Sequence, residues 1–227
     1  IEALRNLVVA AGVESEDIIL DFFAGSGSTG HAIMDLNAFD GGNRKYICVQ
    51  LDEKVAEDSE AYVDGFRTIS DICAERLRQV SNNLKRSSES DLGFRFHKLD
   101  SSKFKAWSDY QGNDLDELRG LLQSQLDSTF VEGATEEAIL TEILLLEGFP
   151  LTSEIEMDET FQKNIVLRIS HQWCEHRLFV TLDKEIQEET IRMAEDLEKI
   201  DIFICLDNAL TDQDKLRLAD VCRLKTI

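Results

Sequence analysis

Residues 17–34 read DIILDFFAGSGSTGHAIM and contain a short apolar run, a glycine-rich turn and a segment with helical spacing. The run at 17–23 is nearly continuously apolar and holds two isoleucines, which is typical of a strand buried on both faces of a parallel sheet. The next apolar run, KYICVQLDE at 45–53, completes a strand–turn–helix–strand unit. The stretch therefore predicts a parallel βαβ unit and an α/β fold.

The letters GSGSTG at 25–30 satisfy the G-x-G-x-x-G pattern of dinucleotide-binding turns. Gly25 permits the tight turn, Gly27 lets the backbone approach a ligand, and the following helix presents its positive end. Asp21, four residues before Gly25, places a carboxylate at the mouth of the turn. A carboxylate there repels a pyrophosphate and attracts a cationic group such as an amine.

Two alternatives for this turn stay open, and a third is excluded. Asp21 can simply cap the turn, and a dinucleotide site can use Asp52 as the acid that binds the ribose. A P-loop is excluded because no Lys-Ser or Lys-Thr follows the glycines.

The composition is that of a folded protein with a strongly acidic charge balance: of 227 residues, 43% are apolar and 30% charged. The net charge is −21, divided into 11 − 18 = −7 for residues 1–100 and 13 − 27 = −14 for residues 101–227. A surface that follows phosphates is basic, so neither half resembles a DNA-gripping module by itself. Five scattered cysteines without a C-x-x-C pair predict reduced thiols and a cytoplasmic location. No apolar run is long enough to predict a membrane span.

The rest of the chain alternates between helical and strand patterns. The predicted helices cover 1–12, 66–84, 114–126, 135–147, 188–199 and 212–222, and the further strands cover 94–102, 177–183 and 200–207. Thr135 is the expected N-cap of its helix, and Gly148 the stop. The last four of these segments, from 177 to 222, predict a second βαβ unit that lacks a glycine turn. A polar stretch at 108–135 suggests a domain boundary, which we set between residues 110 and 111.

The signature DFFAGSG at 21–27 matches the D-x-F-x-G-x-G pattern of methyltransferases that use S-adenosylmethionine. The wider segments resemble the C-terminal portion of the modification subunit of type III restriction–modification systems. These modification subunits are adenine-specific DNA methyltransferases of the β arrangement. The segments that carry this resemblance are 18–37, 41–53, 65–80, 93–107, 136–156 and 178–221. They span nearly the whole chain, and DFFAGSGSTGHA and TISDICAERLRQV are the most specific of them.

The resemblance implies a partial Rossmann-like methyltransferase sheet followed by a smaller α/β C-terminal module. Residues 1–110 would bind S-adenosylmethionine, and residues 111–227 would serve assembly or subunit docking. In the family the acid receives the methionine amino group and the Phe packs against the cofactor. The implied cofactor-binding residues are Asp21, Phe22, Phe23, Ala24, Gly25, Ser26, Gly27, Ser28, Thr29 and Gln50.

The end of the second strand departs from the common methyltransferase pattern, in which a carboxylate accepts both ribose hydroxyls. The aligned position is Gln50, whose amide accepts on one side only and also donates. We favour Gln50 for the ribose. Asp52, two residues on and hence on the same strand face, is the alternative.

The family's catalytic Asp-Pro-Pro-Tyr is absent from this sequence, whose one proline is Pro150. We therefore assign no catalytic residue and expect a fragment that begins inside the cofactor half and is inactive alone. The resemblance implies DNA contacts through upstream segments, a restriction subunit as partner and a homodimer, without membrane contact. The alternatives are an NAD-dependent oxidoreductase and a non-enzymatic assembly module.

Three other features give weaker signals. HQWCEH at 171–176 groups two histidines with Cys174, but strand geometry would turn His171 away from the other two, so no metal is expected. His31 is interpreted as a half-exposed histidine in the first turn of its helix. Trp107 is interpreted as a core anchor.

Overall fold

A computed structural model describes residues 1–84, 92–106, 112, 114–120 and 129–227. The chain forms two compact units, Ile1–Lys98 and Leu99–Ile227. The domain boundary expected between residues 110 and 111, like Trp107, lies outside the described residues and stays a prediction. In the described part of the chain, no helix has the length and apolar character to cross a membrane.

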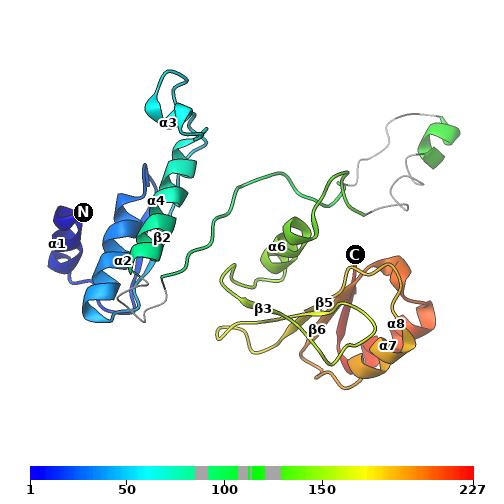
Figure 1. The fold of residues 1–227 in the computed structure, drawn as a ribbon. Helices are drawn as coiled ribbons and strands as arrows, with labels where there is room; N and C mark the ends of the chain where they lie inside the picture. Colours follow the sequence, from blue (N-terminus) through cyan, green and yellow to red (C-terminus); the bar gives the residue numbers. More distant parts are fainter. Residues whose placement is uncertain (85–91, 107–111, 113, 121–128) are drawn as a thin grey trace. The chain divides into compact units, whose positions relative to one another are not determined.

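The N-terminal unit is built on a pair of parallel strands. Its elements are α1 (Glu2–Ala10), β1 (Ile18–Asp21), α2 (Ser28–Asp40), β2 (Lys45–Cys48), α3 (Glu60–Val63) and α4 (Ile69–Leu84) (Figure 1). β1 and β2 pair in parallel from Ile18–Lys45 to Asp21–Cys48, with α2 as the crossover between them. The predicted βαβ unit is confirmed.

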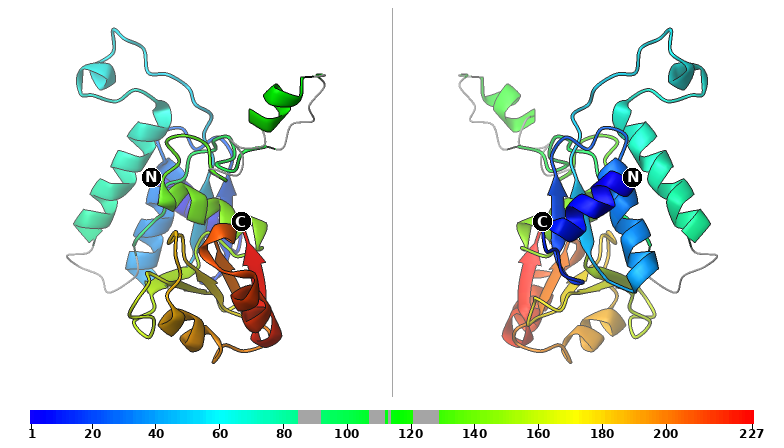
Figure 2. Two further views of the ribbon diagram at one scale, coloured as in Figure 1. Left: turned by 90° about the vertical axis from the view of Figure 1, so that its right-hand side faces the viewer. Right: turned by 90° about the vertical axis from the view of Figure 1, so that its left-hand side faces the viewer.

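Helices α2 and α4 run side by side in this unit (Figures 1 and 2). The core between them and the strands contains Ala24, Met34, Cys73, Leu77, Val80 and Leu92. Both ends of α2 are set by glycines in the left-handed conformation, Gly27 at φ 79° and Gly41 at φ 72°. Such residues start and stop a helix without the steric cost that a Cβ would bring.

The expectation that the first strand is buried on both faces is wrong. Ile18 and Leu20 of β1, and Ile47 and Val49 along β2, each have about half of their surface exposed. The reason is that α2 covers one face of the pair, whereas the described residues of this unit provide no second layer of helices. A buried parallel sheet needs helices on both faces.

The third strand expected at 94–102 does not form, and residues 92–102 carry no ladder hydrogen bonds. The pattern FRFHKLD has the composition of a strand, but a strand requires a neighbour with which to pair. In this unit the described sheet has only the order β1-β2.

The C-terminal unit contains a mixed five-stranded sheet in the order β3-β4-β5-β6-β7, the larger sheet of the two units. Its elements are α6 (Glu136–Leu146), β3 (Glu154–Met157), β4 (Leu167–Ser170), β5 (Leu178–Val180), α7 (Glu188–Ala194), β6 (Ile202–Cys205), η1 (Asp207–Ala209), α8 (Asp212–Val221) and β7 (Arg223–Thr226). β3, β4 and β5 are antiparallel neighbours, whereas β5, β6 and β7 are parallel. The predicted second βαβ unit, β5-α7-β6, is confirmed.

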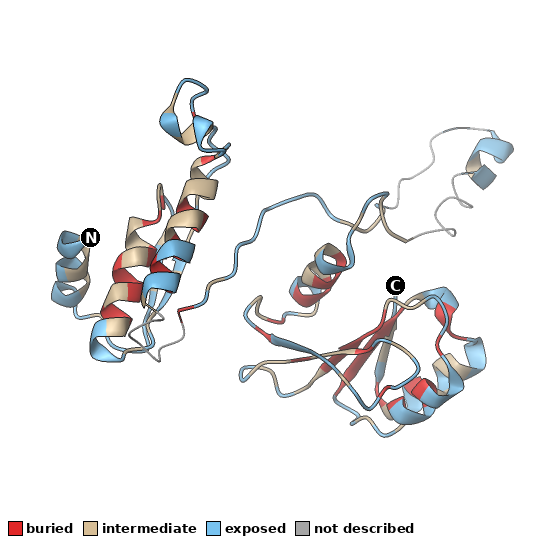
Figure 3. Ribbon diagram, in the orientation of Figure 1, coloured by how far each residue is buried: buried red, intermediate tan, exposed pale blue. Residues whose placement is uncertain are grey.

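The core of this unit surrounds the central strands β5 and β6, all of whose residues are buried (Figure 3). Phe179 and Phe203 lie in one core cluster, with α7 and α8 residues. Leu178, Ile202 and Ile204 lie in a second cluster, with the apolar residues of α6. The predicted helix at 135–147 is confirmed with its cap, since the Thr135 side chain accepts from the Ala138 N–H at 3.3 Å.

Three strands of this sheet were not predicted. β3 (EIEM) and β7 (RLKT) are short, polar edge strands, and β4 (LRIS) is equally short. Their pairing with neighbours in space, rather than their own patterns, makes them strands. The segment 171–176, which we interpreted as a strand, is a turn between β4 and β5. The predicted helix at 114–126 is described only at residues 114–120, of which 115–120 are helical.

Candidate functional site

Asp21 is the last residue of β1 and lies beside the start of α2. One carboxylate oxygen accepts from the Thr29 hydroxyl at 2.6 Å, and the other accepts from the Phe23 N–H at 3.0 Å. An ionised carboxylate has about four acceptor positions, so these two bonds leave capacity for a further donor. The side chain is half-buried. Asp21 therefore caps the local turn and can also receive a cationic ligand group.

The glycine turn adopts a conformation that only glycine accepts easily. Gly25 has φ 51° and Gly27 has φ 79°, both in the left-handed region. A Cβ at Gly27 would lie 2.7 Å from the Cys73 Sγ of α4. At Gly30, a Cβ would approach Leu77 and Tyr46 at 2.9 and 3.1 Å. The second and third glycines of the pattern thus permit close helix packing, whereas the first permits the turn.

Gln50 lies two residues beyond β2 and connects this strand to the turn. Its Oε1 accepts from the Gly25 N–H at 2.8 Å, and the Val49 carbonyl accepts from the Ala24 N–H at 3.1 Å. The Gly27 N–H donates to the Ala24 carbonyl at 2.8 Å. Three N–H groups of the turn are therefore engaged within the protein. A pyrophosphate site on a glycine turn depends on such donors being available.

Two neighbouring aromatic side chains lie at the surface beside Asp21. Phe23 has 83% of its surface exposed and Phe22 has 64%, and their rings meet edge to face with centroids 6.3 Å apart. Ala24 is buried in the core, and Ser26 and Ser28 are half-buried at the start of α2. Exposed aromatic rings next to a carboxylate offer an apolar surface for a flat ligand.

Arg76 of α4 lies at this site and was not predicted from the sequence. Its guanidinium donates to the Ser28 hydroxyl at 2.8 Å, in the first turn of α2. Burial lowers the pKa of the neighbouring His31; Asp35, 3.6 Å from its Nε2, opposes this shift, and Arg76 adds to it. The available signal was the i, i+3 spacing of Cys73 and Arg76, which puts both on one face of α4.

Asp52, the alternative ribose acid, lies on the surface of the N-terminal unit. It has 74% of its side chain exposed and forms an ion pair with Lys54 at 2.9 Å. Among the described residues the Asp52 carboxylate accepts from Lys54, whereas Gln50 accepts from the glycine turn. The geometry thus brings Gln50, and not Asp52, to the glycine turn.

The remaining histidines and cysteines do not form a metal centre in the described residues, in which no group of three or more His, Cys, Asp or Glu could hold an ion. The His171 ring accepts from the Trp173 N–H at 3.2 Å, and the His176 ring packs edge-on against Phe149. All five cysteines are free thiols. Burial raises the pKa of Cys48 to about 11 and that of Cys205 to about 12, so these two thiols are poor nucleophiles at neutral pH.

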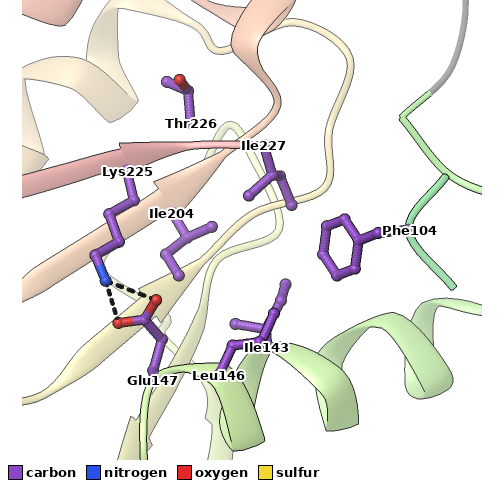
Figure 4. A pocket seen from close by; sticks show the side chains of 8 residues that line it. All are labelled: Phe104, Ile143, Leu146, Glu147, Ile204, Lys225, Thr226 and Ile227. Carbon is purple, nitrogen blue, oxygen red and sulfur yellow. Dashed lines mark hydrogen bonds and ion pairs between the residues drawn. The ribbon is translucent and has the colours of Figure 1, made fainter. Parts of the chain in front are cut away.

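A cavity of about 290 Å³ lies in the C-terminal unit between α6 and the ends of β6 and β7 (Figure 4). Phe104, Ile143, Leu146 and Ile204 form its apolar wall, and Ile227 closes one side. The Lys225 amino group contacts both oxygens of Glu147, at 2.8 and 2.6 Å. The two charged groups at its edge are therefore paired with each other, and apart from them and Thr226 the lining is apolar. The glycine turn remains the stronger candidate site.

Residues 2–61 match the model of a family described as DNA methylase. This region contains α1, β1, the glycine turn, α2 and β2, and thus the whole βαβ unit that carries the candidate site. The class of proteins that this region resembles is the DNA methylases, and its structure is of mixed α/β type.

Similar proteins narrow this class. The chain is 28% identical to the StyLTI Mod subunit of a type III restriction-modification enzyme of Salmonella typhimurium over 177 residues, which are 68% of this chain and 27% of that protein. It is 32% identical to the EcoPI Mod subunit of Escherichia phage P1 over 152 residues, 66% of this chain and 22% of that protein. It is 45% identical to the type II methyltransferase M.KpnI of Klebsiella pneumoniae over 76 residues, 34% of this chain and 18% of that protein.

The chain spans about a quarter or less of the length of these curated relatives. Together, the family match over residues 2–61 and the similarity to type III Mod subunits support the interpretation of this chain as part of a modification methyltransferase.

Proposed function

We propose that this chain is the cofactor-binding and C-terminal part of a site-specific DNA adenine methyltransferase of the β arrangement, the modification subunit of a type III restriction–modification system. The reaction of the whole protein would transfer a methyl group from S-adenosylmethionine to the exocyclic amino group of adenine. In this proposal residues 1–110 form the cofactor part, and residues 111–227 form a module for assembly or subunit docking.

The single observation that carries the proposal is the chemistry of the turn between β1 and α2. It presents the Asp21 carboxylate, while the N–H groups of Ala24, Gly25 and Gly27 are engaged within the protein. A ligand with a protonated amino group fits this arrangement, because a carboxylate attracts an ammonium group and forms strong charge-assisted hydrogen bonds with it. A pyrophosphate fits poorly, since it would lie beside the Asp21 carboxylate and three N–H groups of the turn are already engaged. The observation therefore favours a methyl donor of the amino-acid type over a dinucleotide.

The other residues of the turn fit S-adenosylmethionine as well. Phe22 and Phe23 are exposed without a core role, so their rings are available to pack against an adenine. Ser26, Ser28 and Thr29 surround the first turn of α2, whose positive end favours the methionine carboxylate. Gln50, beyond the end of the second strand, accepts from the Gly25 N–H and so helps to fix the turn. When bound, S-adenosylmethionine supplies the methyl group; the residues of this chain hold and orient it.

The chain is expected to bind the methyl donor without transferring its methyl group. Its single proline is Pro150, so an Asp-Pro-Pro-Tyr motif cannot be formed from its residues. Its charge of −21 also argues that other segments supply most contacts with DNA phosphates. The proposed partners are DNA, the restriction subunit and a second copy of the modification subunit, and the proposed location is the cytoplasm.

The experiment is calorimetry of the 227-residue chain with S-adenosylmethionine, its demethylated product and NAD. We expect heat with the first two ligands only. In Asp21→Asn, affinity for both should fall about tenfold or more, because a hydrogen bond to a charged group contributes roughly 1.5–3 kcal/mol. The matched control is Asp52→Asn, which removes an exposed carboxylate of the same unit and should leave affinity unchanged.

Preferential binding of NAD would contradict the methyltransferase proposal. Equal affinity of Asp21→Asn and the wild type would remove Asp21 from the site. Binding of neither ligand, with the chain folded, would favour the assembly module.

A further inference from the structure

The Gln50 side chain is held by the glycine turn, and its orientation follows from the chemistry of its partner. The Gly25 N–H is a donor, so the atom 2.8 Å away from it must be an acceptor, the Oε1 of Gln50. The amide Nε2 of Gln50 can only donate and cannot take that place. This hydrogen bond joins residues that are 25 positions apart in the sequence and connects the end of β2 to the first glycine of the turn.

The bond acts at the point where the turn is most demanding. Gly25 has φ 51°, and two backbone hydrogen bonds lie beside it, Ala24 N–H to Val49 O and Gly27 N–H to Ala24 O. Together with the Ala24 bond, the Gln50 bond fixes two successive N–H groups of the turn to the end of β2. The glycine turn also determines where α2 begins relative to Asp21. A side chain that holds Gly25 therefore links the end of β2 to the part of the candidate cofactor site formed by Asp21 and the start of α2.

We propose that Gln50 is a positioning residue, which orders the glycine turn by accepting from the Gly25 N–H and does not accept from the ribose hydroxyls of the cofactor. This inference rests on the proposed function for its cofactor, but the Gly25 contact is a property of the chain itself. It also accounts for glutamine at this position. A neutral amide orders the turn without adding a second negative charge near Asp21.

The test compares Gln50→Met with Gln50→Glu in the 227-residue chain. Methionine has a similar length but no comparable acceptor, whereas glutamate retains an oxygen that can accept from Gly25. Amide hydrogen exchange of Gly25, followed by NMR without ligand, reports the contact directly. We expect exchange to accelerate about fivefold or more in Gln50→Met, the loss expected for one neutral hydrogen bond, and to change little in Gln50→Glu. Asp52→Asn serves as the control for a nearby polar substitution, and urea unfolding verifies that each variant folds.

The second readout is a thermodynamic cycle with S-adenosylhomocysteine and its 2′-deoxyribose analogue. Gln50→Met should weaken binding of both ligands by the same factor, roughly fivefold, and Gln50→Glu should restore it. A tenfold or larger coupling between the Met substitution and the 2′-hydroxyl would show a ribose contact and overturn the proposal. Unchanged Gly25 exchange in Gln50→Met would overturn it too. If no ligand binds the wild type, the proposed function fails, whereas the Gly25 exchange still decides the role of Gln50.

Discussion

At the scale of single residues, the candidate site depends on the backbone of the glycine turn between β1 and α2, which accepts few substitutions. Asp21 is the last residue of β1 and Gln50 follows its parallel neighbour β2, and each accepts hydrogen bonds from the segment 23–29. The turn is thus held from both strands. Its glycines have different roles, because a Cβ on Gly25 would meet only a backbone oxygen at 3.9 Å, whereas one on Gly27 would meet Cys73.

Gly27→Ala should therefore destabilise the N-terminal unit by about 3 kcal/mol. The left-handed conformation costs an alanine about 1–2 kcal/mol, and overpacking against the Cys73 Sγ adds about as much. The control is Gly12→Ala, which has φ 72° but no atom within 4 Å of the added Cβ, and should cost only the first part. Urea unfolding measures both variants. Equal losses of unfolding free energy in the two variants would show that the contact with Cys73 adds no cost at Gly27.

At the scale of elements, the C-terminal sheet depends on a buried carboxylate between strands. Asp201 precedes β6 and has only 2% of its side chain exposed. It accepts from the Arg177 N–H before β5 at 2.9 Å and from the Glu198 N–H at 3.2 Å, and its own carbonyl accepts from the Arg223 N–H at the start of β7. The Arg177 guanidinium forms an ion pair with it. One residue thus fixes the starts of three parallel strands.

Asp201→Asn should destabilise this unit by about 2 kcal/mol, because an amide N–H₂ then faces N–H donors and the buried charge pair is lost. Glu198→Gln is the matched control, since Glu198 reaches the same Arg177 at 3.4 Å but has 69% of its side chain exposed. That change should cost less than about 0.5 kcal/mol. Chemical denaturation of both variants compares the two carboxylates. Equal losses of stability in the two variants would mean that the burial of Asp201 does not increase its contribution to stability.

The same carboxylate makes the stability of the C-terminal unit depend on pH. Burial alone would raise the pKa of Asp201, but the hydrogen bonds from Arg177 and Glu198 outweigh it and lower the pKa below the ordinary 3.8. The charged form therefore stabilises the fold above about pH 4, and this contribution is lost as the pH falls through the lowered pKa. Unfolding measured between about pH 5 and 2 should show a steeper loss in the wild type than in Asp201→Asn. Parallel curves would contradict this assignment.

At the scale of the whole molecule, the two units differ in how completely they are covered. The C-terminal unit buries both faces of its central strands, whereas the β1–β2 pair leaves Ile18, Leu20, Ile47 and Val49 half-exposed. Leu99, the first residue of the C-terminal unit, is fully exposed. A cut before it therefore removes no buried side chain at the junction.

Residues 99–227 should therefore fold alone, with the same unfolding midpoint as the second transition of the full chain. We expect the N-terminal unit to unfold first, because less of its apolar surface is removed from water. Calorimetric unfolding of the full chain and of the 99–227 fragment measures this, with Gly27→Ala and Asp201→Asn as markers for each unit. A single transition shifted by both substitutions would contradict independent folding.

Several features of this protein could be predicted from local patterns. The run at 17–23 contains the predicted strand, although not its predicted burial on both faces. The glycine turn and the helix after it formed as predicted, as did the capped helix α6 and the β5-α7-β6 unit. These elements have their signals inside one segment: apolar runs, left-handed glycines and a threonine cap. Asp21 could be identified as a candidate site residue for the same reason, because its position four residues before Gly25 can be read from the sequence.

The features that only the tertiary structure decided join residues distant in sequence. Gln50 accepting from Gly25, Arg76 donating to Ser28 and Cys73 packing on Gly27 cross 25 to 48 positions, and no local pattern encodes them. The short strands β3, β4 and β7 formed and the expected strand at 94–102 did not, for one reason. A strand is stabilised by hydrogen bonds to its neighbours, so its existence depends on what the fold places beside it.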